Sequence, residues 1–413
     1  MTPAQPSGHN TTAIVIGLDT LPGLQTARIL AGHGIPVIAI ASDPGHHCCR
    51  TNVCDEIHYA NARSPEFLAK LNEIAATLDH KAVLYPCLDP AVLIISAHRQ
   101  ELEKRFLISL ADSETVDLLT NKVSFYRYAE EAGLSIPKTF FLQSRADAVA
   151  AADRIEFPGV LKPSVRLEGW DSNTSKKAFK VETAEELLEL YERCHTWTDT
   201  LIFQEWIEGG DDSLYSCNCY FDASSNPLTT FVARKIRQWP PGIGFSSLGE
   251  EVREDFVRDE TVRLFSGVNY RGLGYVELKR DTRTGKSYII EPNIGRPTGR
   301  SAIAEAGGVE LLYTMYCDVL DLPLPAQREQ TYSGAKWIDL RHDFQSALYY
   351  WRKGELSLGD WRRSWQGKKA YAYFAADDMA PFLHDLFNAA KKALLPGTNK
   401  KQNRTAQQSS GSA

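Results

Sequence analysis

The sequence predicts an α/β protein whose amino-terminal part is a doubly wound parallel sheet and whose remainder is an α+β region. Residues 13–43 alternate strand, helix and strand, and further strand candidates follow at 81–89 and 105–112. Such alternation is typical of parallel sheets. From residue 201 onward, strand-like runs follow one another with short polar turns, which indicates an antiparallel sheet. At 413 residues the chain is long enough for two or three domains.

The first predicted strand, "AIVIGL", runs into the turn "GLDTLPG" (17–23) and then into a helix that ends at Gly34. This turn is similar to dinucleotide-binding loops, and Asp43 lies where a ribose-binding acid could follow. The G-x-G-x-x-G pattern is absent, however. We therefore favour a structural or substrate-lining turn over a nicotinamide site.

The stretch "HHCCRTNVC" (46–54) gathers histidines and cysteines, the side chains that bind zinc. Adjacent side chains do not readily chelate one ion together, and no CxxC pair or second ligand cluster is present. We favour a loop with buried thiols. Eight cysteines without a regular framework are typical of reduced thiols in a cytosolic protein. Because we find neither a signal peptide nor an apolar run of membrane-spanning length, we expect a cytoplasmic location.

The middle of the chain places lysines on predicted regular elements. A helix begins near Lys122 and ends at Gly133, and the later strand "FPGVLKPS" carries Lys162. A polar segment (165–178) and a helix (183–194) follow. Either lysine alone would be interpreted as a surface residue. A bound triphosphate needs cations of this kind, however, so the motifs described below favour a role for both lysines in phosphate binding.

The stretch "YVELKRDTRTGKSYIIEPNIGRP" (275–297) predicts a β-hairpin with a polar turn. If the turn centres on Thr284, Glu277 and Glu291 face each other across the strands, and Asn293 shares their face. Opposed carboxylates whose Cβ atoms are roughly 5 Å apart repel each other. A hard cation such as Mg²⁺, which takes oxygen ligands, would resolve the repulsion.

Three further stretches offer groups that could bind a nucleotide or an anion. "QEWIEGGDD" (204–212) could present backbone groups to adenine and an acid to ribose, or be a simple interdomain turn. In "ARKIRQWPPGIGFSS" strand alternation predicts that Arg237 shares a face with Lys235, although a charged edge strand is the alternative. In "NIGRPTGRS", Arg296 and Arg300 could grip a carboxylate or phosphate bidentately.

In this order and spacing, the motifs resemble the ATP-grasp superfamily over residues 119–320. The resemblance is to its carboxylate–amine ligases, including the D-aspartate-ligase-like branch. It is carried by "NK" (121–122), "VLKP" (160–163), "QEWIEGGDD", "ARKIRQ", "GLGYVELKRD" and "EPN". Each motif is weak by itself, but their succession is specific. The resemblance implies a two-subdomain ATP-grasp fold behind the amino-terminal α/β domain.

The resemblance also implies a domain organisation. The expected parts are an amino-terminal α/β domain (1–115), a small subdomain with a lid (116–200), a large subdomain with the metal site (201–325), a C-terminal α+β extension (326–396) and a disordered tail (397–413). The lid corresponds to residues 165–178. It contains only one glycine, Gly169, so its phosphate contacts could instead come from Ser175, Lys176 or Lys177.

Roles for individual residues follow from the resemblance. The residues expected to bind ATP are Lys122 and Lys162 at the phosphates, Glu205, Trp206 and Ile207 at adenine, and Asp212 at the ribose. The expected ligands of Mg²⁺ or Mn²⁺ are Glu277, Glu291 and Asn293. The expected catalytic residues are Lys235 and Arg296 at the γ-phosphate or acyl phosphate, and Arg300 at the substrate carboxylate. Relatives often have Glu-x-Asn-x-Arg, whereas here one more residue precedes Arg296.

The implied reaction is an ATP-dependent ligation. A carboxylate is activated as an acyl phosphate and an amine then displaces phosphate, which forms an amide or peptide bond and leaves ADP. Positioning and charge neutralisation suffice for this chemistry, so no covalent nucleophile is required. The alternatives are a catalytically inactive nucleotide-binding sensor of the same fold and an ATP-grasp enzyme with a non-amine acceptor.

The expected partners are a small carboxylate and a small amine, such as amino acids or their derivatives. The net charge of −6 argues against nucleic acid, and we expect no membrane partner. Related enzymes are often dimers, which leaves a homodimer as one assembly to test.

Overall fold

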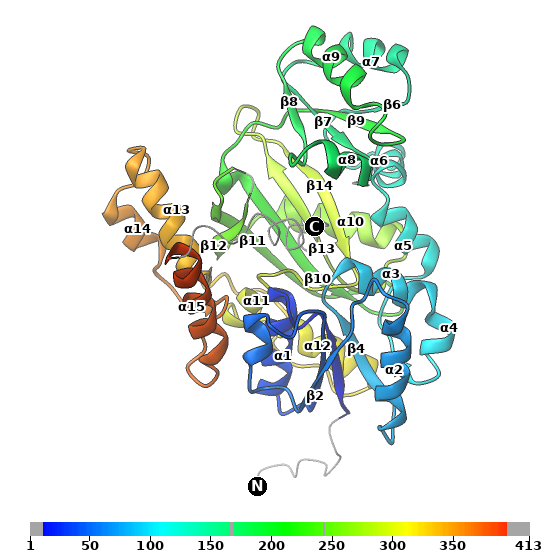
Figure 1. The fold of residues 1–413 in the computed structure, drawn as a ribbon, viewed down its shortest axis with the longest axis vertical. Helices are drawn as coiled ribbons and strands as arrows, with labels where there is room; N and C mark the ends of the chain where they lie inside the picture. Colours follow the sequence, from blue (N-terminus) through cyan, green and yellow to red (C-terminus); the bar gives the residue numbers. More distant parts are fainter. Residues whose placement is uncertain (1–10, 166–167, 243, 395–413) are drawn as a thin grey trace.

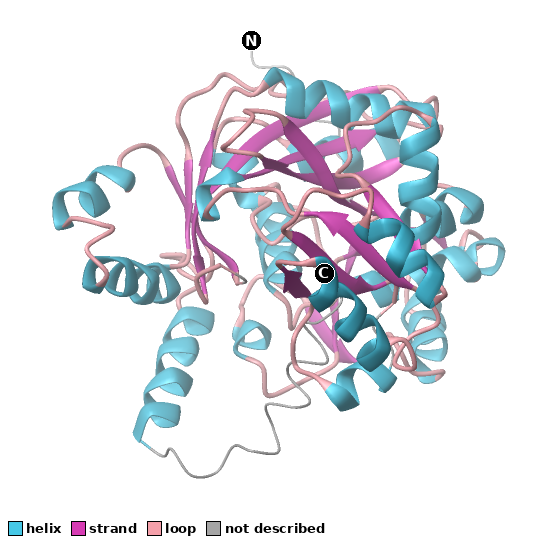
Figure 2. Cartoon of the chain, turned by 90° about the horizontal axis from the view of Figure 1, so that it is seen from above, coloured by secondary structure: helices cyan, strands magenta, loops and turns pink. Residues whose placement is uncertain are grey.

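Three β-sheets form the frame of the protein (Figure 1), in a computed structural model that describes residues 11–165, 168–242 and 244–394. They are a five-stranded, a four-stranded and a seven-stranded sheet, which follow one another along the chain and are drawn in magenta in Figure 2. The parallel sheet followed by α+β parts agrees with the fold class predicted from the sequence. Among the described residues, no helix combines the length and apolar character needed to cross a bilayer.

The amino-terminal sheet is parallel, with the strand order β3-β2-β1-β4-β5. Its central strands are buried along their whole length, which explains their unbroken Val, Ile and Ala composition. Its strands are β1 (Ala13–Ile16), β2 (Val37–Ala41), β3 (Glu56–Tyr59), β4 (Ala82–Pro86) and β5 (Phe106–Leu107). Its helices are α1 (Leu21–Gly32), η1 (His47–Arg50), α2 (Glu66–Ala76), α3 (Asp89–Ala97) and α4 (Arg99–Leu102).

Two helices, α5 (Ser113–Thr120) and α6 (Lys122–Glu131), lead to the antiparallel four-stranded sheet, whose order is β6-β9-β7-β8. Phe203 and Leu161 of this sheet form a core with Leu187 and Trp170. Its strands are β6 (Thr139–Leu142), β7 (Gly159–Pro163), β8 (Phe179–Val181) and β9 (Leu201–Glu205). Its helices are α7 (Arg145–Ala152), α8 (Glu168–Asn173) and α9 (Ala184–Cys194).

The seven-stranded sheet has the order β14-β13-β10-β11-β12-β15-β16 and is antiparallel except for its last pair. Helices α10 and α12 cover opposite faces, because Cys217 and Cys219 pack with α10 whereas Tyr220 packs with α12. The strands are β10 (Leu214–Phe221), β11 (Pro227–Trp239), β12 (Phe245–Glu251), β13 (Gly272–Arg280), β14 (Ser287–Ile294), β15 (Lys336–Ile338) and β16 (Lys369–Tyr371). The helices are η2 (Asp211–Ser213), α10 (Asp255–Gly267), α11 (Ala302–Ala306) and α12 (Leu311–Val319).

The C-terminal region continues this same sheet. Strand β15 pairs with β12 and β16 pairs with β15. Helix α13 (Leu340–Arg352) lies beside β11 and β12, and α14 (Leu358–Ser364) packs next to α13 (Figure 1). Helix α15 (Ala380–Leu394) packs against η1, and Arg28 Nε lies 2.9 Å from Asp378 Oδ2. The domain boundaries stay a prediction, and the tail predicted to be disordered lies outside the described residues.

Candidate active site

The hairpin β13–β14 has the register predicted from its sequence. Glu277 pairs directly with Glu291, and Tyr275 pairs with Asn293. Because side chains alternate along a strand, both glutamates and Asn293 project from one face of the sheet. A register shift between Glu277 and Leu278 places an extra residue on β14 just before Glu291. The expected group of oxygen donors is therefore brought onto one face of the hairpin.

Lys122 is delivered to this face by the start of α6. The Asn121 side chain caps the helix, accepting hydrogen bonds from Val123 N at 2.9 Å and Ser124 N at 3.2 Å. Lys122 Nζ lies 3.2 Å from Glu291 Oε1. The nearby charge of Glu291 raises the pKa of Lys122, so this lysine stays charged. The dipeptide Asn-Lys thus combines a helix cap with a cation at the hairpin.

One helical turn further, Tyr126 connects α6 to both neighbouring sheets. Its hydroxyl donates to Ile290 O at 2.5 Å and accepts from Lys162 Nζ at 3.3 Å. Lys162 also lies 5.0 Å from the centroid of the Tyr126 ring. Burial and the charge of Lys122 lower the pKa of Lys162 to about 8, against the opposing attraction of Glu291. A negatively charged neighbour is therefore needed to keep Lys162 protonated above its pKa.

Glu291 remains ionised between these lysines. Burial by itself raises the pKa of its carboxyl, but the charges of Lys122 and Lys162 outweigh burial and lower the pKa below its ordinary value. Two cations and a carboxylate, from α6, β7 and β14, thus meet where the four-stranded sheet faces the hairpin of the seven-stranded sheet. Such a cluster suits phosphate groups that arrive with a divalent ion.

Arg296 is fully engaged within the protein. It donates to Asn293 Oδ1 at 2.8 Å and to Tyr275 Oη at 2.9 Å, and it forms a two-point ion pair with Asp89 at the start of α3. The extra residue before it is Gly295, whose φ of +70° and whose position 2.5 Å from Leu110 Cδ1, measured from an added Cβ, favour glycine. Arg296 therefore orients Asn293 and ties the hairpin to the amino-terminal domain.

Arg300 lies over the same sheet face with donor capacity to spare. Its Nη2 donates to Ser216 Oγ at 2.9 Å, while its buried Nε has no partner among the described residues. Ser216 pairs with Glu277 on one side and with Ala233 on the other, which places Arg300 near the middle of the sheet. Burial lowers the pKa of Arg300, although the charge of Glu277 opposes it. An anionic ligand would supply the missing acceptor.

Lys235 is buried on this face, and its Nζ donates to Gln238 Oε1 at 2.9 Å. Gln238 Nε2 in turn donates to Asp211 Oδ1 at 2.6 Å. Tyr350 of α13 donates to the other oxygen of Asp211 at 2.7 Å. Burial lowers the pKa of Lys235 to about 8, and the nearby Glu277 and Asp211 oppose this shift.

The prediction that Arg237 shares a face with Lys235 is wrong. Register shifts on both sides of Arg237 break the alternation of β11, so Lys235 bonds to Gln238 instead. Arg237 points to the other face, where it forms hydrogen bonds of 2.8 and 3.0 Å with Asp343 of α13. A bulge leaves no mark in the hydrophobic pattern of this strand, which explains the error.

The end of β9 carries the residues expected at adenine and ribose. Glu205 N donates to Lys138 O at 3.0 Å, and Trp206 N donates to Pro158 O at 3.2 Å. The Trp206 ring lies between Lys180 at 5.0 Å and Lys279 at 5.1 Å, measured to its centroid. The side chain of Ile207 is buried, and that of Asp212 is exposed. These residues belong to the connection between β9 of the four-stranded sheet and β10 of the seven-stranded sheet.

The predicted lid includes a short helix, α8, and residues 166 and 167 lie outside the described part. Trp170 is buried and donates from Nε1 to Lys176 O at 2.8 Å. A Cβ added at Gly169 would lie 2.8 Å from Trp197 O, so this glycine serves close packing. Lys177 Nζ lies 5.6 Å from the centroid of the Phe245 ring on β12, which brings the lid toward the large sheet.

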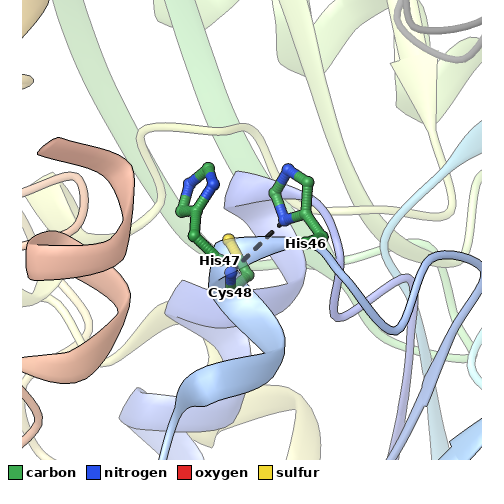
Figure 3. Close-up of side chains that lie close together, drawn as sticks. All are labelled: His46, His47 and Cys48. Carbon is green, nitrogen blue, oxygen red and sulfur yellow. Dashed lines mark hydrogen bonds between the residues drawn. The ribbon is translucent and has the colours of Figure 1, made fainter. Parts of the chain in front are cut away.

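The histidine–cysteine stretch forms the turn η1 with its cap His46, where the side chains of His46, His47 and Cys48 lie close together (Figure 3). The ligand atoms of His46, His47 and Cys48 lie within 4.8 Å of one another, and no further His, Cys, Asp or Glu of the described residues joins the group. His46 Nδ1 accepts a hydrogen bond from Cys48 N at 3.3 Å, and the ring of His47 packs edge-on against Tyr373. Burial raises the pKa of the Cys48 thiol well above its usual range. These contacts favour a capped turn with a protonated thiol.

Comparison with solved structures identifies the fold. The chain aligns with N5-carboxyaminoimidazole synthetase from Staphylococcus aureus with a TM-score of 0.60 and 14% identity, over 77% of this chain and 79% of that one. It also aligns with the biotin carboxylase domain of Hydrogenobacter thermophilus 2-oxoglutarate carboxylase in complex with MgADP, with a TM-score of 0.59, 15% identity, and coverage of 77% and 71%. The chain has the ATP-grasp fold.

Sequence similarity places this ATP-grasp protein near peptide-type ligases. It is 29% identical to D-aspartate ligase of Enterococcus faecium over 239 residues, 54% of each chain. It is 27% identical to D-alanine–D-alanine ligase of Pseudomonas fluorescens over 197 residues, 45% of this chain and 55% of the relative. The chain spans about half the length of these curated relatives. No protein-family model matches it.

Several residues of the candidate site were not identified from the sequence. Tyr126 could have been identified, because its spacing of four residues from Lys122 places both side chains on one helix face. Asp89 could also have been, since it follows a parallel strand at its carboxyl end, where ligands of such sheets bind. Asp211 and Tyr350 lie 139 positions apart, and no local pattern indicates that they meet.

Proposed function

We propose that this protein is an ATP-dependent ligase that activates a carboxylate as an acyl phosphate and joins it to an amine, with release of ADP and phosphate. The observation that carries the proposal is the opposed pair Glu277 and Glu291, with Asn293 beside them and Lys122 and Lys162 around them. Similarity to D-aspartate ligase and D-alanine–D-alanine ligase supports an amino acid or peptide as substrate.

The donor set fits a divalent metal ion. Glu277, Glu291 and Asn293 offer carboxylate and amide oxygens, the ligands that Mg²⁺ or Mn²⁺ accepts. Glu291 is ionised, and its ion pair with Lys122 is partly open to solvent, so a phosphate-bound ion can replace the lysine contact. When bound, the ion would neutralise charge on the β- and γ-phosphates of ATP. Solved ATP-grasp relatives in complex with MgADP support this assignment.

The remaining residues are assigned from their positions. Lys122 and Lys162 would contact the phosphates, and Glu205 with Trp206 and the Ile207 backbone would hold adenine. Asp212, whose carboxylate is exposed, would accept hydrogen bonds from the ribose hydroxyls.

Acyl transfer is assigned to the middle of the large sheet. Lys235 would bind the γ-phosphoryl group as it moves to the carboxylate, and Arg300 would hold the substrate carboxylate through its unpartnered Nε. Arg296, whose donors are already occupied, would keep Asn293 in place for the metal ion. The segment 165–178 would close over the phosphates and exclude water from the acyl phosphate.

The decisive experiment follows ADP release with single amino acids, dipeptides, small carboxylates and bicarbonate, with and without hydroxylamine. We expect ADP release that requires a carboxylate, and a hydroxamate product when hydroxylamine traps the acyl phosphate. Release with bicarbonate alone would make bicarbonate the activated carboxyl group and favour a carboxylation, which the structural similarity to biotin carboxylase also allows. Nucleotide binding without turnover in any mixture would favour the sensor.

A further inference from the structure

We propose that the C-terminal segment completes the active site: Tyr350 of α13, acting through Asp211 and Gln238, fixes the position of Lys235. This rests on the proposed function for the role of Lys235. The segment lies far along the chain from the ATP-grasp motifs. Three consecutive side-chain hydrogen bonds of 2.7, 2.6 and 2.9 Å nevertheless connect it to Lys235 Nζ.

The first step of the argument concerns the orientation of Gln238. A glutamine amide presents an acceptor at one end and two donors at the other. Asp211 accepts from Gln238 Nε2, so Gln238 Oε1 must turn toward Lys235, where it accepts from the ammonium group. A flipped amide would place its NH₂ group against the Lys235 ammonium group and its oxygen against the Asp211 carboxylate. Asp211 therefore decides whether Lys235 meets an acceptor or a donor.

The second step concerns how Asp211 itself is held. Its carboxylate is buried and accepts from the backbone N–H groups of Gln238 at 3.2 Å and Gly242 at 3.1 Å. Tyr350 supplies the remaining side-chain donor. Asp211 thus joins η2, the bulged end of β11 and α13. It is a positioning residue, because it reaches the reacting groups only through Gln238 and Lys235.

The third step concerns the helix that carries Tyr350. Asp343 lies seven residues earlier in α13, two turns away, and therefore on the same helix face. It pairs with Arg237 on the opposite side of the bulge and accepts from the indole N–H groups of Trp361 at 2.9 Å and Trp365 at 2.7 Å. Helix α13 therefore holds the bulge at two points, directly at Arg237 and through Asp211 at Gln238, and the bulge places Gln238 beside Lys235.

The electrostatic setting makes Lys235 sensitive to this arrangement. Burial lowers its pKa to about 8, the charges of Glu277 and Asp211 raise it, and Arg300 and Lys177 lower it further. These groups come from β13, η2, the loop after β14 and the lid. Loss of the Gln238 acceptor or of the Asp211 charge would lower the pKa, so a larger fraction of Lys235 would be uncharged near neutral pH.

The test compares Tyr350→Phe and Asp211→Asn with the control Tyr349→Phe, which removes a neighbouring hydroxyl outside the chain of hydrogen bonds. The pH dependence of Lys235 acetylation by acetic anhydride is followed by mass spectrometry of the full-length protein. We expect the labelling midpoint to fall by about half a pH unit or more in Asp211→Asn, which removes the charge, to fall less in Tyr350→Phe, which releases one oxygen of Asp211, and to stay at the wild-type value in the control. Where ligase activity is measurable, kcat should fall about three- to tenfold with an unchanged KM for ATP.

The readouts separate the two proposals. A shifted midpoint in a protein without ligase activity would retain the positioning of Lys235 and remove the proposed function. An unshifted midpoint in Tyr350→Phe would overturn the positioning role, even if kcat fell, because a general structural defect would explain that loss. Tyr350→Phe keeps the test valid if Asp211→Asn fails to fold, since it removes only one hydroxyl.

Discussion

Two ion pairs on the seven-stranded sheet differ in how they are enclosed. The side chains of Lys122 and Glu291 are 36% and 27% exposed, whereas those of Arg237 and Asp343 are 5% and 0% exposed. The first pair has few other partners, while Asp343 also accepts two indole N–H groups. Partly open charges can exchange one partner for a ligand, and enclosed charges cannot. The first pair is thus suited to binding and the second to holding the frame.

The largest effect is expected from breaking the enclosed pair. Asp343→Ala would leave Arg237 buried without a counter-charge and remove the acceptor of two tryptophans. Because an unpaired buried charge is costly, we expect the free energy of unfolding to fall by about 3–5 kcal/mol. Urea denaturation measures it. Asp259→Ala, which removes an exposed pair with Arg258, should leave the midpoint unchanged, and an equal midpoint in both variants would contradict the contrast.

Breaking the open pair should affect activity and spare stability. Glu291→Gln removes the charge that would bind the metal ion, and we expect carboxylate-dependent ADP release to fall roughly 10²- to 10³-fold. The free energy of unfolding should change by less than about 1 kcal/mol, since a partly exposed pair contributes little. Glu254→Gln is the matched control, because its 3.1 Å pair with Arg280 is similarly exposed. If Glu291→Gln lost as much stability as Asp343→Ala, both ion pairs would serve to stabilise the fold.

The sequence identified both residues of the open pair as site residues, without their contact, and missed the enclosed pair for a physical reason. Glu277 and Glu291 belong to a hairpin, where strand period and turn length fix which residues face each other. Lys122 lies at a helix start that the Asn121 cap marks. Arg237 and Asp343 are 106 residues apart, and a bulge sets their geometry. Long-range pairs of this kind leave no local pattern to read.

The pH dependence of nucleotide binding tests the partly exposed cluster of Lys122, Lys162 and Glu291. The pKa of Lys162 is about 8, so its charge is lost as the pH rises past 8. We expect the affinity for MgADP to weaken about tenfold between pH 7 and 9.5, because a charged hydrogen bond to phosphate disappears. ADP is the probe because it lacks the γ-phosphoryl group, to which Lys235 is assigned. The measurement therefore reports on Lys162. Calorimetric titration of wild type and Lys162→Met checks this, and a flat wild-type profile would contradict it.

The stability of the nucleotide-free protein should change in the opposite direction over the same range. Between pH 8 and the ordinary lysine pKa of 10.5, Lys162 binds a proton in the unfolded chain more than in the folded one. The contribution of Lys162 to the free energy of unfolding therefore rises with pH in this window. Lys162→Met should reduce the rise, as measured by the difference in urea midpoints between the two proteins at pH 8 and 10.

The smallest effect is expected at an exposed acid. Asp212 lies in the open, so Asp212→Asn should leave the thermal midpoint unchanged. Loss of a charged acceptor for ribose should raise the KM for ATP about threefold and leave kcat unchanged. Asp199→Asn, another exposed acid, provides the control for a general charge effect. Equal KM values in the two variants would remove Asp212 from the nucleotide site.

Electron paramagnetic resonance of Mn²⁺ in the presence of ADP tests the central claim most directly, because it observes the ion itself. The account predicts a nucleotide-dependent bound Mn²⁺ signal that Mg²⁺ displaces, that Glu277→Gln and Glu291→Gln each abolish, and that Glu254→Gln retains. A bound signal that persists unchanged in both hairpin variants would place the ion elsewhere and contradict the proposed metal site.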